Sequence, residues 1–176
     1  MSLSSRVFPQ LNESEEQDIL SVCTRIEASA GTAVLRKGDG GGDLYVVETG
    51  VFKVYEDEAG EEYVIALLNP GDVFGELSFL DGSPRSASVR AQSDGSLLKL
   101  ERSAIPSLVL RNPYTATRLL FSLASIVSAR LRKADEALAN LAFGQQEASC
   151  EELHSLAAEM YREVFAELSR YPRGAD

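Results

Sequence analysis

A single cation stands among small residues in the stretch FGELSFLDGSPRSASV, which spans residues 74–89. Arg85 follows Pro84 and precedes Ser86, and the small side chains nearby leave main-chain N–H groups accessible. A guanidinium presents a planar fork of donors that matches two phosphate oxygens, and the Ser86 hydroxyl adds another donor. The stretch therefore predicts an anion-binding site that suits a phosphate group.

The residues just before this cation add a flexible backbone position and a carboxylate. Gly75 permits a positive φ or a close approach of the backbone, and the ELSFL that follows predicts one helical turn, whose first N–H groups favour anions. Glu76 would repel an anion, so its place is explained if it accepts a hydrogen bond from a hydroxyl such as a ribose 2′-OH. A phosphate and a hydroxyl on one compact ligand indicate a nucleotide. The structural alternative is that Arg85 pairs with Glu76 or Asp81 and only supports the loop.

The overall composition is that of an ordinary globular chain. Its 176 residues are 44% hydrophobic and 25% charged, with a formal net charge of −10. This length is enough for one domain with an appendage. The acidity argues against general nucleic-acid binding, which depends on Lys and Arg. No run approaches the ~20 apolar residues of a membrane span. The first residues lack a signal-peptide core, so we expect a cytoplasmic protein.

Residues suited to catalysis or metal binding are sparse. Cys23 and Cys150 are far apart and His154 is the single histidine, so neither a nucleophile with its base nor a thiolate metal site is indicated. The acidic EDEAGEE at 56–62 lacks calcium-loop spacing and is interpreted as a hairpin tip. The glycines GDGGGD at 38–43 lack a following Lys-Ser/Thr and are interpreted as a turn. We expect no catalytic residue, no metal and no enzyme activity.

The elements that must position the site change in character along the chain. Residues 12–27 predict a capped helix. Its apolar face consists of Ile19, Leu20, Cys23 and Ile26. From 31 to 100, turn residues separate the short runs TAVLRK, DLYVVET, VFKVYED, EYVIALL, SASVRA and GSLLKL. Six or more such strands predict an α+β protein built on an antiparallel β-roll, a double-stranded β-helix or jelly-roll-like barrel, with an N-terminal helix and C-terminal helices.

The last part of the chain has a helical pattern. A short helix is expected over 101–112 and a long one over 113–143, with Pro113 in its first turn. A final amphipathic helix is expected over about 147–170. Its apolar stripe consists of Leu153, Ala157, Met160 and Val164. We expect three segments: an N-terminal arm at 1–11, a domain at 12–143, and an extra helix with a frayed tail at 144–176.

The long helix carries two apolar stripes. One is a heptad seam made of Leu120, Ala124, Val127, Leu131, Ala134, Leu138 and Leu141. The other consists of Leu119, Leu123 and Ile126. We expect the second stripe to pack on the domain and the seam to bind the same helix of a second copy, which gives a homodimer through 113–143. The alternative is that the final helix folds back and covers the seam within one chain.

Residues 8–143 resemble the cyclic nucleotide-binding domain family, which includes the catabolite activator protein, protein kinase A regulatory subunits and cyclic-nucleotide-gated channels. The match is collinear through FPQLNESEEQDIL, GTAVLRKGDGGGDLYVVETGVFKVY, IALLNPGDVFGELSFLDGSPRSASV and RLRKADEALANLAF. Its most specific part is a phosphate-binding cassette in which GEL is followed by PRSA. The resemblance implies a β-roll that binds a 3′,5′-cyclic nucleotide, cyclic AMP or cyclic GMP, and acts as a regulatory module.

The resemblance also implies roles for single residues. The implied phosphate site consists of Ser78, Arg85, Ser86 and Ala87, through side chains and backbone N–H groups. The implied ribose site consists of Gly75, Glu76 and Leu77, with Glu76 accepting from the 2′-OH. A base site at Arg132 and Asp135 is a hypothesis from proximity, because Ala134 and Asp135 replace a Thr-Ser pair that contacts adenine in the catabolite activator protein. The alternative for both residues is a solvated helix face, which leaves the choice of base open.

The chain departs from the catabolite activator branch after Phe143. The acidic segment EASCEELHSLAAEMYREVFAELSRY follows there, and no basic recognition helix can be placed in it. We therefore expect no direct DNA binding, no membrane association, and an unknown effector protein as partner. The expected function is a sensor that transmits ligand binding through its C-terminal helices. The alternatives are a ligand-free dimerisation or scaffold domain, and an enzyme acting on a phosphorylated ligand.

Overall fold

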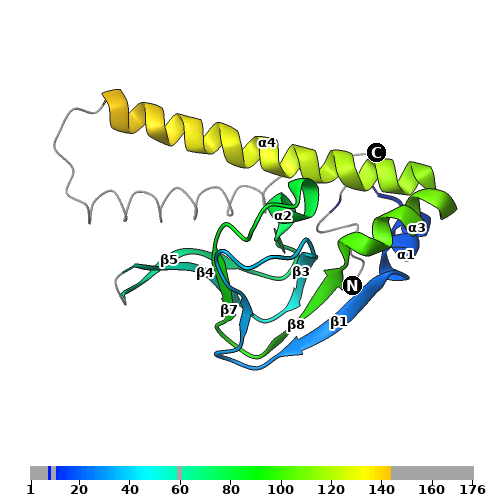
Figure 1. Cartoon of the computed structure of the whole chain (residues 1–176), viewed down its shortest axis with the longest axis horizontal. Helices are drawn as coiled ribbons and strands as arrows, with labels where there is room; N and C mark the ends of the chain where they lie inside the picture. The colour runs from blue at the N-terminus through cyan, green and yellow to red at the C-terminus, as the bar shows by residue number, and fades with distance from the viewer. Residues whose placement is uncertain (1–7, 9–10, 59–60, 144–176) are drawn as a thin grey trace.

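Two four-stranded antiparallel sheets form a roll, and helices cover one side of it (Figure 1). The computed structural model describes residues 8, 11–58 and 61–143. The first sheet has the order β1-β8-β3-β6 and the second β2-β7-β4-β5. The first sheet consists of β1 (Cys23–Ala28), β8 (Gly95–Leu100), β3 (Leu44–Thr49) and β6 (Val73–Phe74). The second consists of β2 (Ala33–Leu35), β7 (Ser88–Ala91), β4 (Phe52–Glu58) and β5 (Glu61–Leu68). The predicted α+β fold with a β-roll is confirmed.

The helices lie before, within and after the strands. They are α1 (Glu13–Leu20), α2 (Glu76–Asp81), the 3-10 turn η1 (Arg102–Ala104), α3 (Ile105–Arg111) and α4 (Pro113–Phe143). The long helix α4 passes across the roll, with α1 and α3 beside its first turns and α2 below its middle (Figure 1). The predicted short and long C-terminal helices are both confirmed. The expected helix at 147–170 lies outside the described residues.

The first sheet separates two hydrophobic cores. Along β3, Leu44 and Val46 face the helices while Tyr45 and Val47 face the second sheet, because successive strand residues point to opposite sides. The helix-side core also contains Ile19, Val73, Phe79, Leu100, Leu108, Leu119 and Leu123. The core inside the roll also contains Phe52, Val54, Ala66, Leu68, Phe74, Val89 and Leu97. A strand buried on both sides explains why DLYVVET lacks a clean alternation of polar and apolar residues.

The predicted helix over 12–27 is wrong in its second half. Asn12 does cap α1, since its side chain accepts from the Glu15 N–H at 3.0 Å and Glu15 accepts from the Asn12 N–H at 2.7 Å. The helix ends at Leu20, and Cys23–Ala28 form β1, paired with β8 from Cys23↔Leu100 to Ala28↔Gly95. Pairing with a strand more than sixty residues away outweighs a local helical pattern.

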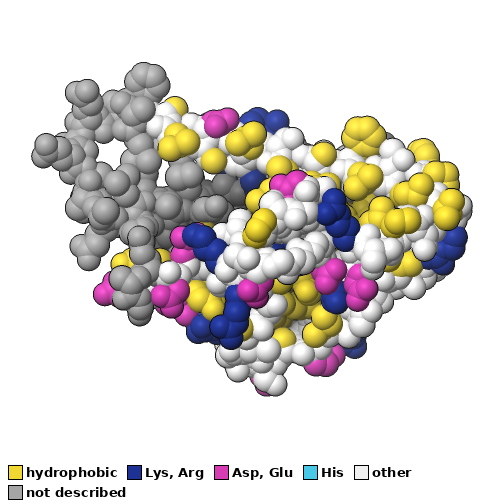
Figure 2. All heavy atoms as spheres, viewed as in Figure 1, with side chains coloured by type: hydrophobic (Ala, Val, Ile, Leu, Met, Phe, Trp, Pro, Cys, Tyr) yellow, Lys and Arg dark blue, Asp and Glu magenta, His cyan; other side chains and the backbone are white. Residues whose placement is uncertain are grey.

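The two stripes of α4 differ in burial, and the second stripe packs on the domain as the sequence predicts. Leu119 and Leu123 are fully buried and Ile126 packs against the same core. Along the seam, Leu120, Leu131 and Leu138 are exposed, whereas Val127 and Ala134 are half-buried. Apolar side chains also gather over α3 and the first turns of α4 (Figure 2). The exposed residues of this patch are Val109, Leu110, Tyr114 and Phe121.

The chain before α1 contributes to the helix-side core. Phe8 and Leu11, which fall in the expected arm at 1–11, are both buried there, and the Leu11 N–H donates to the Phe8 carbonyl at 2.9 Å. Within the described part of the chain, no helix combines the length and the apolar character that crossing a lipid bilayer requires.

Candidate functional site

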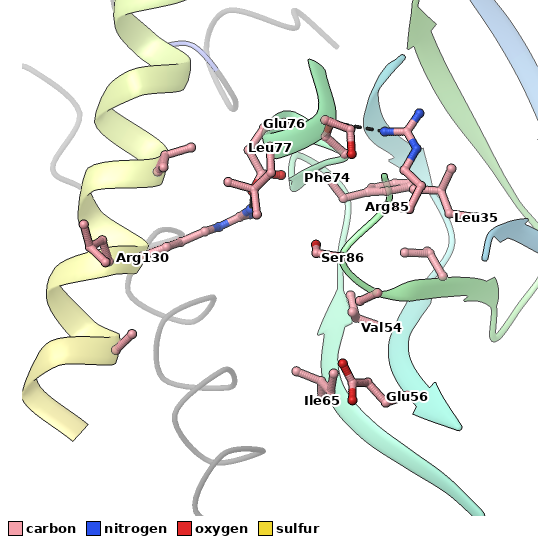
Figure 3. A pocket seen from close by; sticks show the side chains of 17 residues that line it. Leu35, Val54, Glu56, Ile65, Phe74, Glu76, Leu77, Arg85, Ser86 and Arg130 are labelled. Atoms are coloured by element: carbon pink, nitrogen blue, oxygen red, sulfur yellow. Dashed lines mark hydrogen bonds and ion pairs between the residues drawn. The ribbon is translucent and has the colours of Figure 1, made fainter. Parts of the chain in front are cut away.

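A cavity of about 430 Å³ lies between the second sheet, the segment around α2, and α4. This volume falls within the usual range of small-molecule sites. Arg85 and Glu76 lie at one end of the cavity, whereas Glu56 and Ile65 lie at the other (Figure 3). The two ends therefore differ in chemistry.

Arg85 provides a buried positive charge at the first end. The residue is 5% exposed, and its Nη1 donates to the backbone carbonyls of Asp43 at 2.9 Å and Gly75 at 3.2 Å. Its guanidinium lies 5.8 Å from the centroid of the Tyr45 ring. No carboxylate among the described residues forms an ion pair with it. Because carbonyls and a ring offset the burial of a cation only in part, this end of the cavity favours an anion.

The structural alternative for Arg85 is therefore wrong. Glu76 forms an ion pair with Arg130 instead, and Asp81 accepts from the Ser83 N–H at 2.8 Å. The hydrogen bonds with Ser83 lower the pKa of the Asp81 carboxyl. Both carboxylates that could have neutralised the cation thus have other partners.

The glycine-rich segment 38–43 supports Arg85 from outside the cavity. The Gly38 N–H donates to the Arg85 carbonyl at 2.8 Å, and the Arg85 N–H donates to the Asp39 carbonyl at 2.9 Å. An added Cβ at Gly41 would lie 3.7 Å from Arg85 Nη2. The segment is a turn between β2 and β3, as predicted, and it fixes the backbone from which the guanidinium extends.

Gly75 is required by its conformation and by its surroundings. Its φ is +79°, a region that residues with a Cβ rarely adopt. A Cβ there would lie 2.8 Å from Arg85 Nη1 and 2.8 Å from the Asp43 carbonyl oxygen. The glycine thus lets the start of α2 contact the arginine fork directly.

Glu76 connects the cavity to α4. It is 4% exposed and forms an ion pair with Arg130 Nη1, while Arg130 Nη2 donates to the Val73 carbonyl at 2.9 Å. Arg130 lies on α4 and extends across the cavity to reach this carboxylate (Figure 3). One arginine therefore links the long helix to both β6 and the start of α2.

Asp72 precedes this contact in the turn that leads into β6. Burial raises the pKa of its carboxyl to about 6, although the Asn69 N–H, which donates to Oδ2 at 2.6 Å, and the charge of Arg130 both lower it. The positive charge of Arg130 thus lies near two acids that are at least partly shielded from water.

Most of the remaining cavity wall is apolar. The second sheet and the end of β6 contribute Leu35, Val54, Ile65, Val89 and Phe74, and α4 contributes Val127, Leu131 and Ala134. The Phe74 ring stacks on Tyr45 with centroids 5.1 Å apart, which continues the wall toward Arg85. Flat apolar surfaces beside an anion site suit a ligand with a ring system.

Residues 25–112 match the family model described as the cyclic nucleotide-binding domain. The chain is 39% identical over 131 residues to a cyclic AMP receptor protein of Thermus thermophilus, covering 73% of this chain and 59% of the relative. It is 28% identical over 113 residues to a Drosophila melanogaster cAMP-dependent protein kinase type II regulatory subunit, covering 64% and 29%. A crystal structure of a cyclic nucleotide-binding domain from Methylobacillus flagellatus matches with a TM-score of 0.70 and 26% identity, covering 81% of this chain and 82% of that one.

The chain belongs to the cyclic nucleotide-binding domain family. It spans 59% of the Thermus relative and 29% of the Drosophila relative. The cavity occupies the part of the domain that carries the cassette motif.

The structure brings the predicted cassette residues together. All seven line the cavity: Gly75, Glu76, Leu77, Ser78, Arg85, Ser86 and Ala87. Ser78 is buried, whereas Leu77 and Ser86 are exposed to the cavity and to solvent. Their roles toward phosphate and ribose stay predictions.

The predicted base site is not brought to the cavity. Arg132 and Asp135 are exposed and are absent from its lining, and the α4 residues that do line it are Val127, Arg130, Leu131 and Ala134. On a helix, positions three and four apart share a face, so stepping from Val127 places Arg130, Leu131 and Ala134 on the cavity side. Within the described residues, no group of three His, Cys, Asp or Glu side chains is arranged to hold a metal ion.

Sequence reasoning missed two polar residues of the cavity. Arg130 lies three residues after Val127, within the apolar stripe of α4 that also contains Leu131 and Ala134. A cation at that position is the feature of the sequence that could have indicated a polar contact in the cavity. Glu56 lies on β4 two residues after Val54, and the alternation of a strand places both on the same face. It was interpreted instead as part of a charged hairpin tip.

Proposed function

We propose that this chain binds a 3′,5′-cyclic nucleotide in the cavity and acts as a regulatory module. The observation that carries the proposal is the buried Arg85, which has no carboxylate partner among the described residues, beside the buried Glu76. In the proposed pose the cyclic phosphate pairs with Arg85, assisted by Ser78, Ser86 and Ala87. The ribose lies against Gly75, Glu76 and Leu77, with its 2′-OH donating to Glu76.

The names of relatives support a cyclic nucleotide as the ligand class, and both of them name cyclic AMP. Cyclic GMP stays our own alternative, because it has the same phosphate and ribose. The Thermus relative is called a cyclic AMP receptor protein and the Drosophila relative a cAMP-dependent protein kinase regulatory subunit. Both names describe regulation rather than catalysis, so we expect a sensor rather than an enzyme, acting in the cytoplasm on an effector protein. The cavity itself sets no preference between the two nucleotides through Arg85 and Glu76, because phosphate and ribose are common to both.

The proposed output passes through α4. A ribose hydroxyl that donates to Glu76 shares the carboxylate that pairs with Arg130. A ligand can shift the position of a helix only by its differential affinity for two helix positions. Because the carboxylate binds both groups, ligand occupancy changes how firmly Arg130 holds the helix against β6 and α2.

The proposed partner of α4 is the same helix in a second copy. The seam residues Leu120, Leu131 and Leu138 are exposed on the described chain, at 38%, 61% and 61%, which favours an apolar contact outside the domain. Val127, Leu131 and Ala134 belong both to the seam and to the cavity wall. Dimerisation through 113–143 would therefore bring the partner helix against residues that also line the ligand cavity.

The proposed binding is tested by calorimetry with cAMP, cGMP and a cyclic dinucleotide on three proteins. In Arg85→Ala the loss of a desolvated phosphate contact should weaken binding by about 2–5 kcal/mol. Arg90→Ala removes a cation from nearby β7, where Arg90 pairs with Glu62 and does not line the cavity, and should bind like wild type. Wild-type protein that binds neither cAMP nor cGMP would refute the proposed function, even if it bound the cyclic dinucleotide. Arg85→Ala binding within threefold of wild type would remove Arg85 from the site.

The proposed dimer is tested by light scattering on the full chain and on a chain cut after Phe143. The cut should leave nucleotide binding largely intact but change the association state or its response to ligand. Leu138→Asp, which places a charge in the seam outside the cavity lining, should favour the monomer in both chains. One unchanged mass in all samples, with and without cyclic nucleotide, would contradict dimerisation through α4.

A further inference from the structure

Glu56 is a second carboxylate of the cavity, at the end away from Arg85 (Figure 3). It projects from β4, on the same face as Val54 and close to Ile65 of β5. Lys37 Nζ donates to its Oε1 at 2.8 Å, and its side chain is 39% exposed. Its Oε2 accepts no hydrogen bond from the described residues. An acceptor with spare capacity thus faces an otherwise apolar part of the cavity.

The placement of this carboxylate defines what it can contact. If Arg85 takes the phosphate and Glu76 the ribose, the base extends away from both, between the second sheet and α4. The walls there are aliphatic, consisting of Leu35, Val54, Ile65, Val127 and Leu131. Such walls bind either purine ring equally, since they contact its faces and not its polar edges. Among the described residues that line this region, Glu56 supplies a carboxylate that can accept hydrogen bonds from the edge of a base.

The chemistry of a carboxylate separates the two purines. An ionised carboxylate only accepts hydrogen bonds, and two donors side by side can pair with both of its oxygens. The Watson–Crick edge of guanine presents such a pair, the N1–H and the 2-amino group. The same edge of adenine presents one amino group beside the N1 lone pair, which repels the second oxygen.

We propose that Glu56 is the residue that selects the base, and that it favours guanine, so that cyclic GMP binds more tightly than cyclic AMP. The inference rests on the proposed function, because it needs Arg85 and Glu76 to orient the nucleotide. Lys37 donates to one acceptor site of Oε1 and limits the rotation of the carboxylate. The remaining acceptor sites on both oxygens can still pair with the two donors of guanine. A carboxylate that only served the ion pair with Lys37 would not distinguish between the bases.

Calorimetry with cGMP, cIMP and cAMP tests the proposal on wild-type protein. cIMP keeps the N1–H of guanine but lacks its 2-amino group, so the expected order of affinity is cGMP, then cIMP, then cAMP. A bidentate contact to a base discriminates by about fivefold or more. Equal affinities within twofold, or a preference for cAMP, would overturn the role of Glu56 in selecting guanine.

Glu56→Gln supplies the decisive variant. An amide exchanges one acceptor for a donor, so cGMP should lose at least about fivefold while cAMP stays within about twofold of wild type. The matched control is Glu62→Gln, which removes the same charge from neighbouring β5, where Glu62 pairs with Lys53 and Arg90 and does not line the cavity. It should keep the wild-type ratio of cGMP to cAMP.

The outcomes separate this inference from the function on which it rests. Wild-type protein that binds no cyclic nucleotide refutes the proposed function. Binding that is lost in Arg85→Ala, with a cGMP-to-cAMP ratio that is the same in wild type and Glu56→Gln, supports the function and overturns the inference. Melting temperatures of Glu56→Gln and Glu62→Gln, measured without ligand, show whether each variant is folded. The cGMP-to-cAMP affinity ratios are compared only between folded proteins.

Discussion

The two walls of the cavity are held in different ways. The wall that carries Arg85 is fixed by backbone groups: its guanidinium contacts two carbonyls, and its own N–H and carbonyl pair with the segment 38–43. The wall formed by α4 depends on side chains. The first half of that helix is held by the buried Leu119 and Leu123. Beyond Ile126, Arg130 contacts Glu76 and the Val73 carbonyl from the cavity side.

This difference suggests separate roles for the two walls: the Arg85 wall suits ligand binding, and the α4 wall suits a conformational response to it. A wall fixed by backbone hydrogen bonds forms when the roll forms, and it keeps one geometry for the proposed phosphate contact. A wall held by a few side-chain contacts opens locally at a lower free energy than the whole domain. The contact between Arg130 and α2 uses the carboxylate that we propose for the ribose, so the proposed ligand and this contact of α4 share Glu76.

The largest effect is expected from Gly75→Ala, which disrupts the fixed wall. The variant combines a positive φ with a Cβ 2.8 Å from both Arg85 Nη1 and the Asp43 carbonyl. Unfolding in urea should show a loss of at least about 2–3 kcal/mol, and calorimetry should show no nucleotide binding. Gly31→Ala is the control, since Gly31 has a φ of +86° with nothing within 4 Å of an added Cβ. It should lose about 1–2 kcal/mol of stability and keep nucleotide binding. Equal effects of both variants would mean that the positive φ alone, and not the crowding around Gly75, causes the loss.

A smaller and more local effect is expected from Arg130→Ala, which releases the movable wall. Hydrogen exchange in α4 beyond Ile126 should become roughly tenfold faster or more, because a charge-assisted contact worth about 1.5–3 kcal/mol is lost. The added ligand should then change exchange in α4 less than it does in wild type. Arg132→Ala is the matched control, since Arg132 is two residues further on, exposed, and outside the cavity lining. Unchanged exchange in Arg130→Ala would show that the helix is held by other contacts.

The smallest effect is expected from Asp72→Asn, which sharpens the comparison at the turn leading into β6. The folded pKa of Asp72 is about 6 and its ordinary value is 3.8. Between these two pH values the Asp72 carboxyl is protonated more in the folded chain than in the unfolded chain. Its contribution to the free energy of unfolding therefore falls as the pH rises from about 4 to about 6. The variant lacks this fall and should be more stable at pH 7, on the order of 1 kcal/mol after allowing for partial exposure. Identical urea midpoints for both proteins from pH 4 to pH 7 would contradict it.

Local chemistry explains what the sequence could predict. The seven cassette residues lie within thirteen positions, from Gly75 to Ala87, so their types and spacing predict the candidate site before any fold is known. The bounds of α4 follow from Pro113 and a long run without glycine, since a helix is specified by its own hydrogen bonds. The six strand runs were likewise marked by glycine and proline breaks.

Pairing between distant residues explains what the sequence could not predict. The local pattern of Cys23–Ala28 predicts helix, whereas pairing with the distant β8 makes this segment a strand. β6 has only two residues, which are too few to show a strand pattern. The contact of Arg130 with Glu76 joins positions 54 apart, and neither residue type indicates the other. The prediction of Arg132 and Asp135 as base contacts rests on their nearness to the aligned Thr-Ser position of the catabolite activator protein. Their positions on the turns of α4 leave both side chains exposed to solvent.

The ring beneath Arg85 gives the protein a built-in optical reporter. The chain has no tryptophan and six tyrosines, and Tyr45 lies both under the arginine and stacked on Phe74 in the cavity wall. An aromatic ring fixed in an asymmetric surrounding gives near-ultraviolet circular dichroism, and an anion bound to the adjacent guanidinium changes the field on that ring. Occupancy of the cavity can therefore be followed in the unlabelled protein, without attaching a dye to the helix whose movement is in question.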